Sequence, residues 1–263
     1  MSDIIRDFFG FSHLPFSKLL SPKHLFSTHA FDEAFSGLHY GIPTEDLMLL
    51  TGPVGCGKSV LLGALMRELD TNMYVPLYVR GHNLSEGELY KTILAALDQP
   101  APHFAHTAKQ MFFHLLPQAT KKPVVVIDDA QEVRESALLA LKSMCNFDSD
   151  SISKIAFILC GQPELKAILK LAPFLPLRQR IRLFFHMEAM SLEETCQYID
   201  HHTKVAGKPT PLFADGAKAE IFRHTEGIAR QVNFICYRSI LNAAMNSIQV
   251  IDSKNLVREE LSD

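Results

Sequence analysis

The sequence has few cysteines, and none of them are paired at the spacing of a metal site. Its five cysteines are scattered through 263 residues, and no C-x-x-C pair occurs. Because an odd number of scattered thiols does not build a disulfide framework, the sequence argues against both a structural zinc site and a disulfide-stapled fold. We therefore expect a protein of a reduced, cytoplasmic setting.

Long apolar runs and an excess of positive charge are also missing. No stretch reaches the roughly 18 apolar residues that would cross a bilayer. The N-terminus lacks the basic region and apolar run of a secretion signal. We therefore expect no direct insertion into a membrane. The net charge is −3, so no overall positive field favours nucleic acid, although a local basic groove remains compatible with it.

The most informative segment present is a glycine-rich octet. It reads Gly52-Pro53-Val54-Gly55-Cys56-Gly57-Lys58-Ser59 and matches the phosphate-binding loop G-x-x-x-x-G-K-[ST] at every fixed position. A short apolar run precedes it and a helical pattern starting at Val60 follows it. In this context the backbone N–H groups of the loop, extended to Val60, would surround a phosphate. We expect the Lys58 ammonium to neutralise the β- and γ-phosphates of ATP, and the Ser59 hydroxyl to bind Mg²⁺.

Short apolar runs and helical patterns alternate over the first two thirds of the chain. Strands are predicted at residues 47–50, 75–79, 124–127, 155–159 and 183–187, and helices at 60–69, 86–97, 108–119, 136–145 and 163–169. This alternation predicts an α/β fold of three layers, with a parallel five-stranded sheet covered by helices on both faces.

Beyond residue 190 the pattern is helical only. Helices are predicted at residues 191–205, 214–224 and 228–245, with a short one after Asp252. Ser191 and Glu194 have the spacing of a capping box at the start of the first of these helices. We expect three parts: an N-terminal strap over residues 1–45, an α/β core over 46–190 and a helical lid over 191–263.

The N-terminal part is rich in aromatic residues. Its phenylalanines are Phe8, Phe9, Phe11, Phe16, Phe26, Phe31 and Phe35. A hydrophobic strap that seals the edge of the core would account for them, and we favour this interpretation. Part of the same strap would also suit the apolar slot that an adenine ring requires, so it is expected to flank the nucleotide site.

Two acidic residues follow the central predicted strand. The run at 124–127 ends in Asp128 and Asp129, and ligands of open α/β sheets bind at the carboxyl ends of the strands. We expect Asp128 to hold Mg²⁺ through water, and Asp129 to orient or deprotonate the attacking water. Gln162 follows the next strand, where it would sense the γ-phosphate or align the water. A strand-end turn formed with Gly161 and Pro163 explains this position equally well.

Arginines form two further candidate groups. Arg178, Arg180 and Arg182 form a compact basic cluster before the last predicted strand. One of them would reach the γ-phosphate of a neighbouring subunit as an arginine finger, whereas a solvated basic turn is the alternative. Arg230, at the start of a predicted lid helix, would contact the same phosphates, or would simply lie on the face of that helix.

Together these residues resemble the ExeA-type AAA+ ATPases over nearly the whole chain. The matching strings are Pro15-Phe16, Tyr40-Gly41, the glycine loop, Asp128 with Ala130-Gln131, Gly161-Gln162-Pro163-Glu164-Leu165, Leu177-Arg178-Gln179-Arg180-Ile181, Glu193-Glu194-Thr195 with Tyr198-Ile199, and Gly227 with Arg230 and Asn233. The strings around Gln162 and Arg180 are far more specific than the glycine loop alone.

The resemblance implies a AAA+ core and a helical lid with ATP bound between them. It also implies a ring or filament of identical subunits with ATP at their interfaces. On the family's pattern Gln162 takes the first sensor position and Arg230 the second. Arg180 is the first choice for the arginine finger, and Arg178 the second.

The sequence departs from the family in three places. Asp129 stands where the family usually has glutamate, and its side chain is one methylene shorter, so we expect slower hydrolysis. Ser59 replaces the usual threonine but keeps the hydroxyl. Ala229 replaces a common proline before the second sensor.

Family members of this design serve two different processes. Full-length secretion ATPases resemble membrane proteins that carry a transmembrane helix and a periplasmic peptidoglycan-binding part, whereas stand-alone relatives assemble on duplex DNA and activate a transposase. No transmembrane run occurs up to Asp263, and Asp129 suits a slow timer, so we expect a DNA-transposition regulator that binds DNA and a transposase. The alternatives are a secretion-pathway ATPase that acts with a membrane partner, and a weakly hydrolysing nucleotide switch.

The DNA contacts expected for the transposition regulator would come from local polar loops. One candidate loop contains Arg80, His82, Asn83 and Ser85 with Lys91 nearby, and a second patch contains Lys121 and Lys122. These residues would contact phosphates without reading base sequence. A solvated surface explains each of them individually at least as well.

Overall fold

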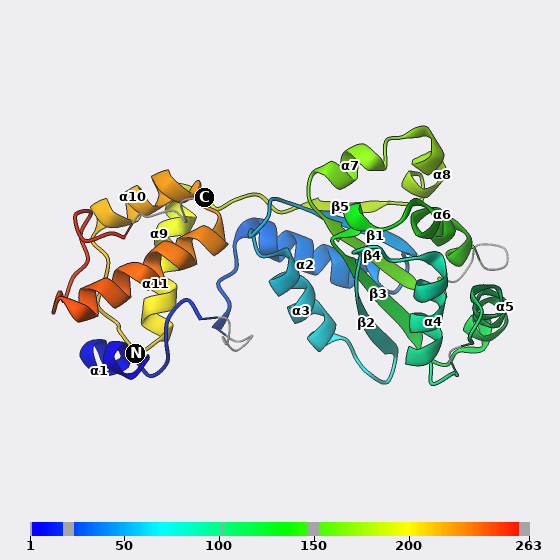
Figure 1. Cartoon of the computed structure of the whole chain (residues 1–263), viewed down its shortest axis with the longest axis horizontal. Coiled ribbons are helices and arrows are strands. Elements are labelled where there is room, and N and C mark those ends of the chain that lie inside the picture. Colours follow the sequence, from blue (N-terminus) through cyan, green and yellow to red (C-terminus); the bar gives the residue numbers. More distant parts are fainter. Residues whose placement is uncertain (1, 18–23, 101, 147–152, 258–263) are drawn as a thin grey trace. The chain divides into compact units, whose positions relative to one another are not determined.

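The computed structural model describes residues 2–17, 24–100, 102–146 and 153–257 (Figure 1). The chain divides into two compact units. The α/β unit comprises residues 30–52 and 58–187, and the helical unit comprises residues 1–29, 53–57 and 188–263. The main division therefore falls between Met187 and Glu188, close to the boundary expected at residue 190.

Five parallel strands form the sheet of the α/β unit, as the sequence predicts. They are β1 (Leu47–Thr51), β2 (Tyr74–Arg80), β3 (Lys122–Asp128), β4 (Ala156–Gly161) and β5 (Leu183–His186). Their order across the sheet is β2-β3-β4-β1-β5. The inner strands β1 and β4 are buried along their whole length, whereas the edge strands β2 and β5 are partly exposed. This difference explains why the inner strands are the most uniformly apolar segments in the sequence.

Helices cover both faces of the sheet (Figure 1). One face carries α2 (His29–Gly41) and α3 (Lys58–Glu68), and the other carries α4 (Glu86–Ala96) and α6 (Glu135–Met144), with α5 (Ala105–Leu115) packed against α4. The second face forms the main apolar core, in which the side chains of Leu47 and Phe157 pack with Leu89 and Leu141. The predicted three-layer α/β core is therefore confirmed.

Shorter elements complete the α/β unit. They are the helices α7 (Glu164–Ile168) and α8 (Leu175–Arg178) and the 3-10 turns η2 (Leu116–Gln118), η3 (Ala130–Glu132) and η5 (Ala172–Phe174). The sequence pattern predicts neither α2 nor α8. The four residues of α8 are too few to establish a helical period.

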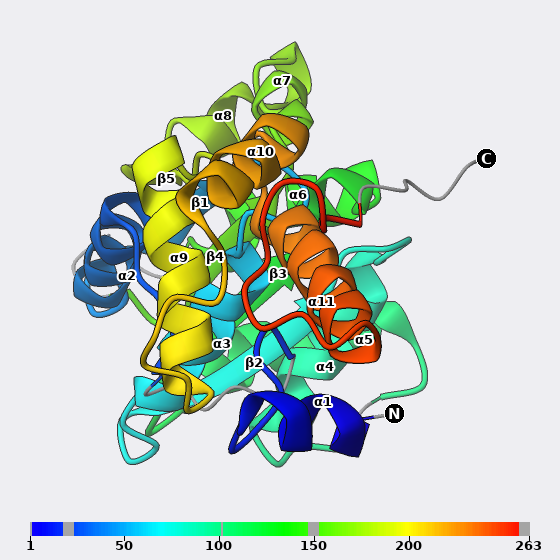
Figure 2. The ribbon, with the colours of Figure 1, turned by 90° about the vertical axis from the view of Figure 1, so that its left-hand side faces the viewer.

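The helical unit contains α9 (Leu192–Val205), α10 (Asp215–Thr225) and α11 (Ala229–Met245), with α1 (Ser2–Phe9) packed against α11 (Figure 2). The capping box predicted for α9 is present, because Ser191 and Glu194 each bond the backbone N–H of the other. The short helix expected after Asp252 does not begin within residues 253–257, where a turn forms at residues 253–254 and the Asp252 side chain accepts the backbone N–H groups of Lys254 and Asn255. The rest of the segment expected to be helical, residues 258–263, lies outside the described residues.

The aromatic N-terminal residues do not form one strap on the α/β core. Phe9, Phe11 and Phe16 are buried in the core of the helical unit, and the ring of Phe16 lies 6.4 Å from that of Tyr198. Phe31, in contrast, lies on α2 in the α/β unit. The expected strap over residues 1–45 is therefore corrected for its first part. Aromatic composition shows that a segment is buried but not which core buries it.

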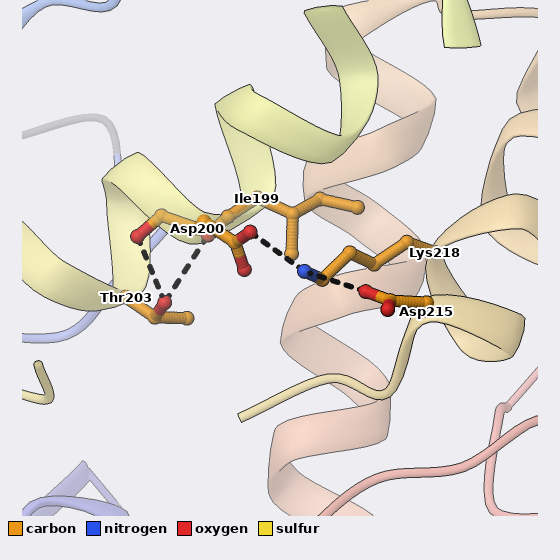
Figure 3. A network of polar contacts seen from close by, with 5 residues as sticks. All are labelled: Ile199, Asp200, Thr203, Asp215 and Lys218. Atoms are coloured by element: carbon orange, nitrogen blue, oxygen red, sulfur yellow. Dashed lines mark hydrogen bonds and ion pairs between the residues drawn. The ribbon is translucent and has the colours of Figure 1, made fainter. Parts of the chain in front are cut away.

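A buried lysine ties α9 to α10 in the helical unit (Figure 3). The Lys218 ammonium lies 2.6 Å from Asp200 Oδ2 and 3.4 Å from Asp215 Oδ1, and only 5% of its side chain is exposed. On the next turn of α9, the Thr203 hydroxyl donates to the backbone carbonyl oxygens of Ile199 and Asp200. The ammonium is therefore desolvated but paired with two carboxylates, which makes its partners necessary.

Replacing Lys218 by methionine is expected to destabilise the protein by about 1–3 kcal/mol, because Asp200 is left without its counter-charge beside an apolar core. Urea unfolding followed by far-UV circular dichroism measures the effect. The exposed Lys204 of α9 provides a matched control, since Lys204→Met removes the same charge from the same unit. Equal stability of the two variants would show that the pair contributes nothing.

Candidate functional site

The glycine loop joins the end of β1 to the start of α3. Gly55 and Gly57 have φ angles of +85° and +104°, which lie in the left-handed region that glycine adopts without strain. The N–H of Cys56 bonds the carbonyl of Pro53 at 3.4 Å and closes the turn. Val54 and Val60 are exposed on either side of the turn. Successive amides in such a turn, followed by a helix N-terminus, form an anion-binding concavity.

Lys58 is the first residue of α3, and only 8% of it is exposed. Its Nζ donates a hydrogen bond to the carbonyl oxygen of Gly52 at 2.8 Å. The lysine therefore reaches back along the loop to its first residue. This contact keeps a nearly buried ammonium at the loop, where it can interact with an anionic ligand.

Ser59 and Asp128 meet although 69 residues separate them in the chain. The Ser59 hydroxyl donates to Asp128 Oδ2 at 3.0 Å, because α3 and the carboxyl end of β3 open at the same edge of the sheet. The Tyr78 hydroxyl donates to the same oxygen, and the N–H of Asp129 donates to Oδ1 at 3.0 Å. The structure thus brings the two predicted metal-binding residues together.

Hydrogen bonds keep Asp128 ionised. Burial raises the pKa of this carboxyl group, but contacts from Tyr78, Cys160 and Ser59 outweigh burial, so its pKa lies below the ordinary value. Burial and the neighbouring carboxylate raise the pKa of Tyr78, which therefore stays a neutral donor. An anionic carboxylate beside a hydroxyl is a hard oxygen donor pair of the kind Mg²⁺ prefers.

Asp129 differs from Asp128 in both backbone and surroundings. It is exposed and has φ +52°, in the left-handed region. Its neighbour in space is Gly81, whose N–H donates to the carbonyl of Asp128 at 2.6 Å. A Cβ atom on Gly81 would lie 2.4 Å from the carbonyl oxygen of Asp129. A glycine is therefore required after β2 for the acidic turn to adopt this shape.

Gln162 lies directly after β4, close to Asp129. Its backbone N–H donates to Gln131 Oε1 at 3.2 Å, and Gln131 Nε2 donates to Asp129 Oδ1 at 3.2 Å. The amide of Gln131 therefore connects the two candidate residues. In the sequence Gln131 stands out only as part of the family resemblance, and no motif singles out Tyr78 or Gly81. These three residues join the site through the packing of β2, β3 and β4.

The predicted arginine finger lies near the amino-terminal ends of the strands, whereas the glycine loop lies at their carboxyl ends. Arg180 precedes β5, whose first residue pairs with Met48 near the start of β1, whereas the glycine loop follows the end of β1. The length of β1 separates these two ends of the strands by about 15 Å, at about 3.3 Å per residue. Arg180 Nη2 donates to Asn146 Oδ1 at 2.8 Å, and Arg178 is exposed on α8. Neither arginine is therefore brought to the glycine loop of its own chain.

Arg230, in contrast, lies against the glycine loop. Its backbone N–H donates to the carbonyl oxygen of Gly55 at 3.1 Å. A Cβ atom on Gly55 would lie 2.8 Å from Arg230 Cβ. Both residues belong to the helical unit, and the Arg230 side chain is exposed. The first turn of α11 therefore lies beside Gly55 of the glycine loop.

The loops considered for DNA offer fewer free groups than the sequence indicates. His82 Nδ1 lies 2.8 Å from Glu132 Oε2, and Lys91 donates to the carbonyl of His103 at 2.7 Å. Lys122 donates to Ser153 Oγ at 2.6 Å, and burial lowers its pKa to about 8. Lys122 is therefore corrected from a surface lysine to a structural one, and Lys121 alone remains exposed in that patch.

Ser85 is also engaged, as the N-cap of α4 in a capping box with Glu88. Within the described ranges, no three His, Cys, Asp or Glu side chains gather where they could hold a metal ion together. No helix formed by the described residues is both long and apolar enough to cross a membrane.

Sequence comparisons relate the chain to a domain family and to a curated secretion-pathway protein. Residues 43–169 match the family model described as an AAA domain. The chain is 31% identical to General secretion pathway protein A of Aeromonas hydrophila over 244 residues, which cover 90% of this chain and 44% of that protein. The chain thus spans less than half the length of this curated relative.

Structural comparisons show the same fold in distant proteins. Cdc6p from Pyrobaculum aerophilum superposes with a TM-score of 0.71 at 19% identity, covering 90% of this chain and 67% of that one. The Holliday junction branch migration motor RuvB of Thermotoga maritima superposes with a TM-score of 0.58 at 18% identity, covering 86% and 64%. At such low identity these likenesses show the fold alone.

Proposed function

Because this chain contains an AAA domain and is similar over 90% of its length to a general secretion pathway protein, we propose that it binds ATP with Mg²⁺ at the glycine loop and hydrolyses it. The contact of 3.0 Å between Ser59 Oγ and Asp128 Oδ2 carries this proposal. It joins the two halves of a nucleotide site, which are far apart in the sequence, beside the nearly buried Lys58. A glycine turn with a structural role alone would not require this convergence.

Each residue of the site has a distinct part in the proposed reaction. The loop amides and Lys58 bind the β- and γ-phosphates, and Ser59 and Asp128 hold Mg²⁺, which neutralises charge on the phosphates when bound. Asp129, exposed and beyond the metal pair, accepts a proton from the attacking water or orients it. Gln162 and Arg230 are the first and second sensors of the nucleotide.

Arg180 supports a reaction shared between subunits. It lies near the amino-terminal ends of the strands, and its own glycine loop lies at their carboxyl ends. Its guanidinium therefore serves only the nucleotide of another chain. A subunit with its phosphate loop at one end of the strands and its arginine finger at the other end forms head-to-tail contacts, which generate rings or filaments. We therefore propose that ATP binds at the interfaces of such an oligomer and drives its assembly.

The process that this ATPase serves is proposed from its curated relative. Similarity over 90% of this chain to a general secretion pathway protein supports a secretion-type ATPase that acts with a membrane partner. The role as a DNA-transposition regulator with a transposase remains a prediction. The engaged side chains of His82, Lys91 and Lys122 weaken its case without addressing other surfaces.

Steady-state phosphate release tests the proposed function. We expect turnover by the wild type and its loss, together with ATP binding, in Lys58→Ala, because the ammonium that pairs the phosphates is removed. Equal rates in the two proteins would contradict hydrolysis at this site. ATP binding without turnover would identify a nucleotide switch instead. Stimulation by duplex DNA that weakens with salt would favour the transposition role.

A further inference from the structure

Gln131 occupies a position between two residues of the proposed catalytic site. It lies in η3, the turn that follows β3, and its side chain is half-buried. Its amide nitrogen donates to Asp129 Oδ1 at 3.2 Å, and its amide oxygen accepts the backbone N–H of Gln162 at 3.2 Å. One side chain therefore bonds the carboxylate after β3 and the backbone after β4.

The chemistry of the two partners fixes the direction of this amide. A backbone N–H can only donate and an ionised carboxylate can only accept. The bridge thus needs an acceptor at one end and a donor at the other, at the length of a glutamine side chain. Methionine has a similar shape but neither group, and glutamate would oppose a second carboxylate oxygen to Asp129.

The surroundings of the amide leave room for this residue and fix its oxygen. Gly161, the last residue of β4, has no side chain, and a Cβ atom there would lie 2.5 Å from Gln131 Oε1. The backbone of Asp129 is held by its turn against Gly81, whereas its carboxylate is exposed. Its bond to Gln131 is the contact that ties this carboxylate to β4.

We propose that Gln131 is a positioning residue that couples the orientation of the Asp129 carboxylate to the position of Gln162. This inference rests on the proposed ATPase function. A displacement of Gln162 by a bound nucleotide would move the acceptor end of the amide, and the donor end would carry the Asp129 carboxylate with it. Sensing of nucleotide and orientation of water would thus be linked through one side chain.

The test compares the kinetics of Gln131→Met and Gln131→Glu with the wild type. We expect kcat for ATP hydrolysis to fall about tenfold or more in both variants, because small misplacements of a catalytic group are costly. ATP affinity and KM are expected to stay within about twofold, since Lys58 and the loop are untouched. Gln197→Glu is the matched control, because Gln197 also donates its amide to a carboxylate, that of Glu193 on α9.

A double-mutant cycle separates positioning from general damage. If Gln131 acts through Asp129, adding Gln131→Met to Asp129→Asn lowers kcat no further. Multiplied losses would overturn the inference, as would an undiminished kcat in Gln131→Met. Should Gln131→Met fail to fold, Gln131→Glu keeps the bond from Gln162 and decides the same question. A wild-type rate no higher than that of Lys58→Ala would instead overturn the proposed function itself.

Discussion

Replacing Arg180 by alanine is expected to reduce ATP turnover by about 10³-fold while ATP affinity stays close to that of the wild type. A finger stabilises negative charge that develops in the transition state, and loss of one lowers kcat by factors of this size. The affinity for ATP is retained because Arg180 and its own phosphate loop lie at opposite ends of the strands. Phosphate release and fluorescent-nucleotide binding measure the two quantities.

Arg178→Ala is the matched control for this substitution, since Arg178 is a nearby arginine that is exposed on α8. A larger loss in Arg178→Ala than in Arg180→Ala would reassign the finger. If Arg180→Ala loses affinity or folding together with turnover, its bond of 2.8 Å to Asn146 is structural, and no finger role follows.

Asp129→Asn is expected to lower kcat by about 10²–10³-fold while the protein still binds ATP. The amide is similar in shape to the carboxylate but cannot accept a proton from water, and general-base catalysis contributes about this much. The expected product is a protein that retains unhydrolysed ATP, which is detected by chromatography of the bound nucleotide.

Asp98→Asn provides a close control for Asp129→Asn. Asp98 is also exposed and also has a left-handed backbone, with φ +57°, so the same chemical change is made in the same conformation elsewhere in the α/β unit. Unchanged hydrolysis in Asp129→Asn would show that this carboxylate is not the base.

The sheet and the glycine loop could be predicted because local sequence determines them. A strand such as β4, buried on both faces, is apolar at every position, and the loop needs glycines at Gly55 and Gly57 whatever the rest of the chain does. The two acids at the end of the apolar run of β3, Asp128 and Asp129, also indicate that they lie at the carboxyl end of the sheet. The pattern gives no sign, however, that Asp128 is held by several donors while Asp129 is exposed.

The remaining parts of the site depend on contacts between distant segments. Tyr78 reaches Asp128 because β2 pairs with β3 in a register that sets Tyr78 opposite Val126, and no periodicity reveals that register. Gly81 shows its role only once the acidic turn is placed against it. The sequence predicts the wrong core for Phe9, Phe11 and Phe16 for the same reason, since burial alone does not identify the partner.

The most direct measurement mixes two inactive variants. Arg180→Ala keeps its own phosphate loop and Asp129, and Asp129→Asn keeps its own Arg180. At an interface where the first variant holds ATP and the second supplies the finger, every group of the proposed site is present. We predict that the mixture, allowed to exchange subunits, releases phosphate at a substantial fraction of the wild-type rate. A mixture as inactive as its separate components would contradict an ATP site shared between subunits.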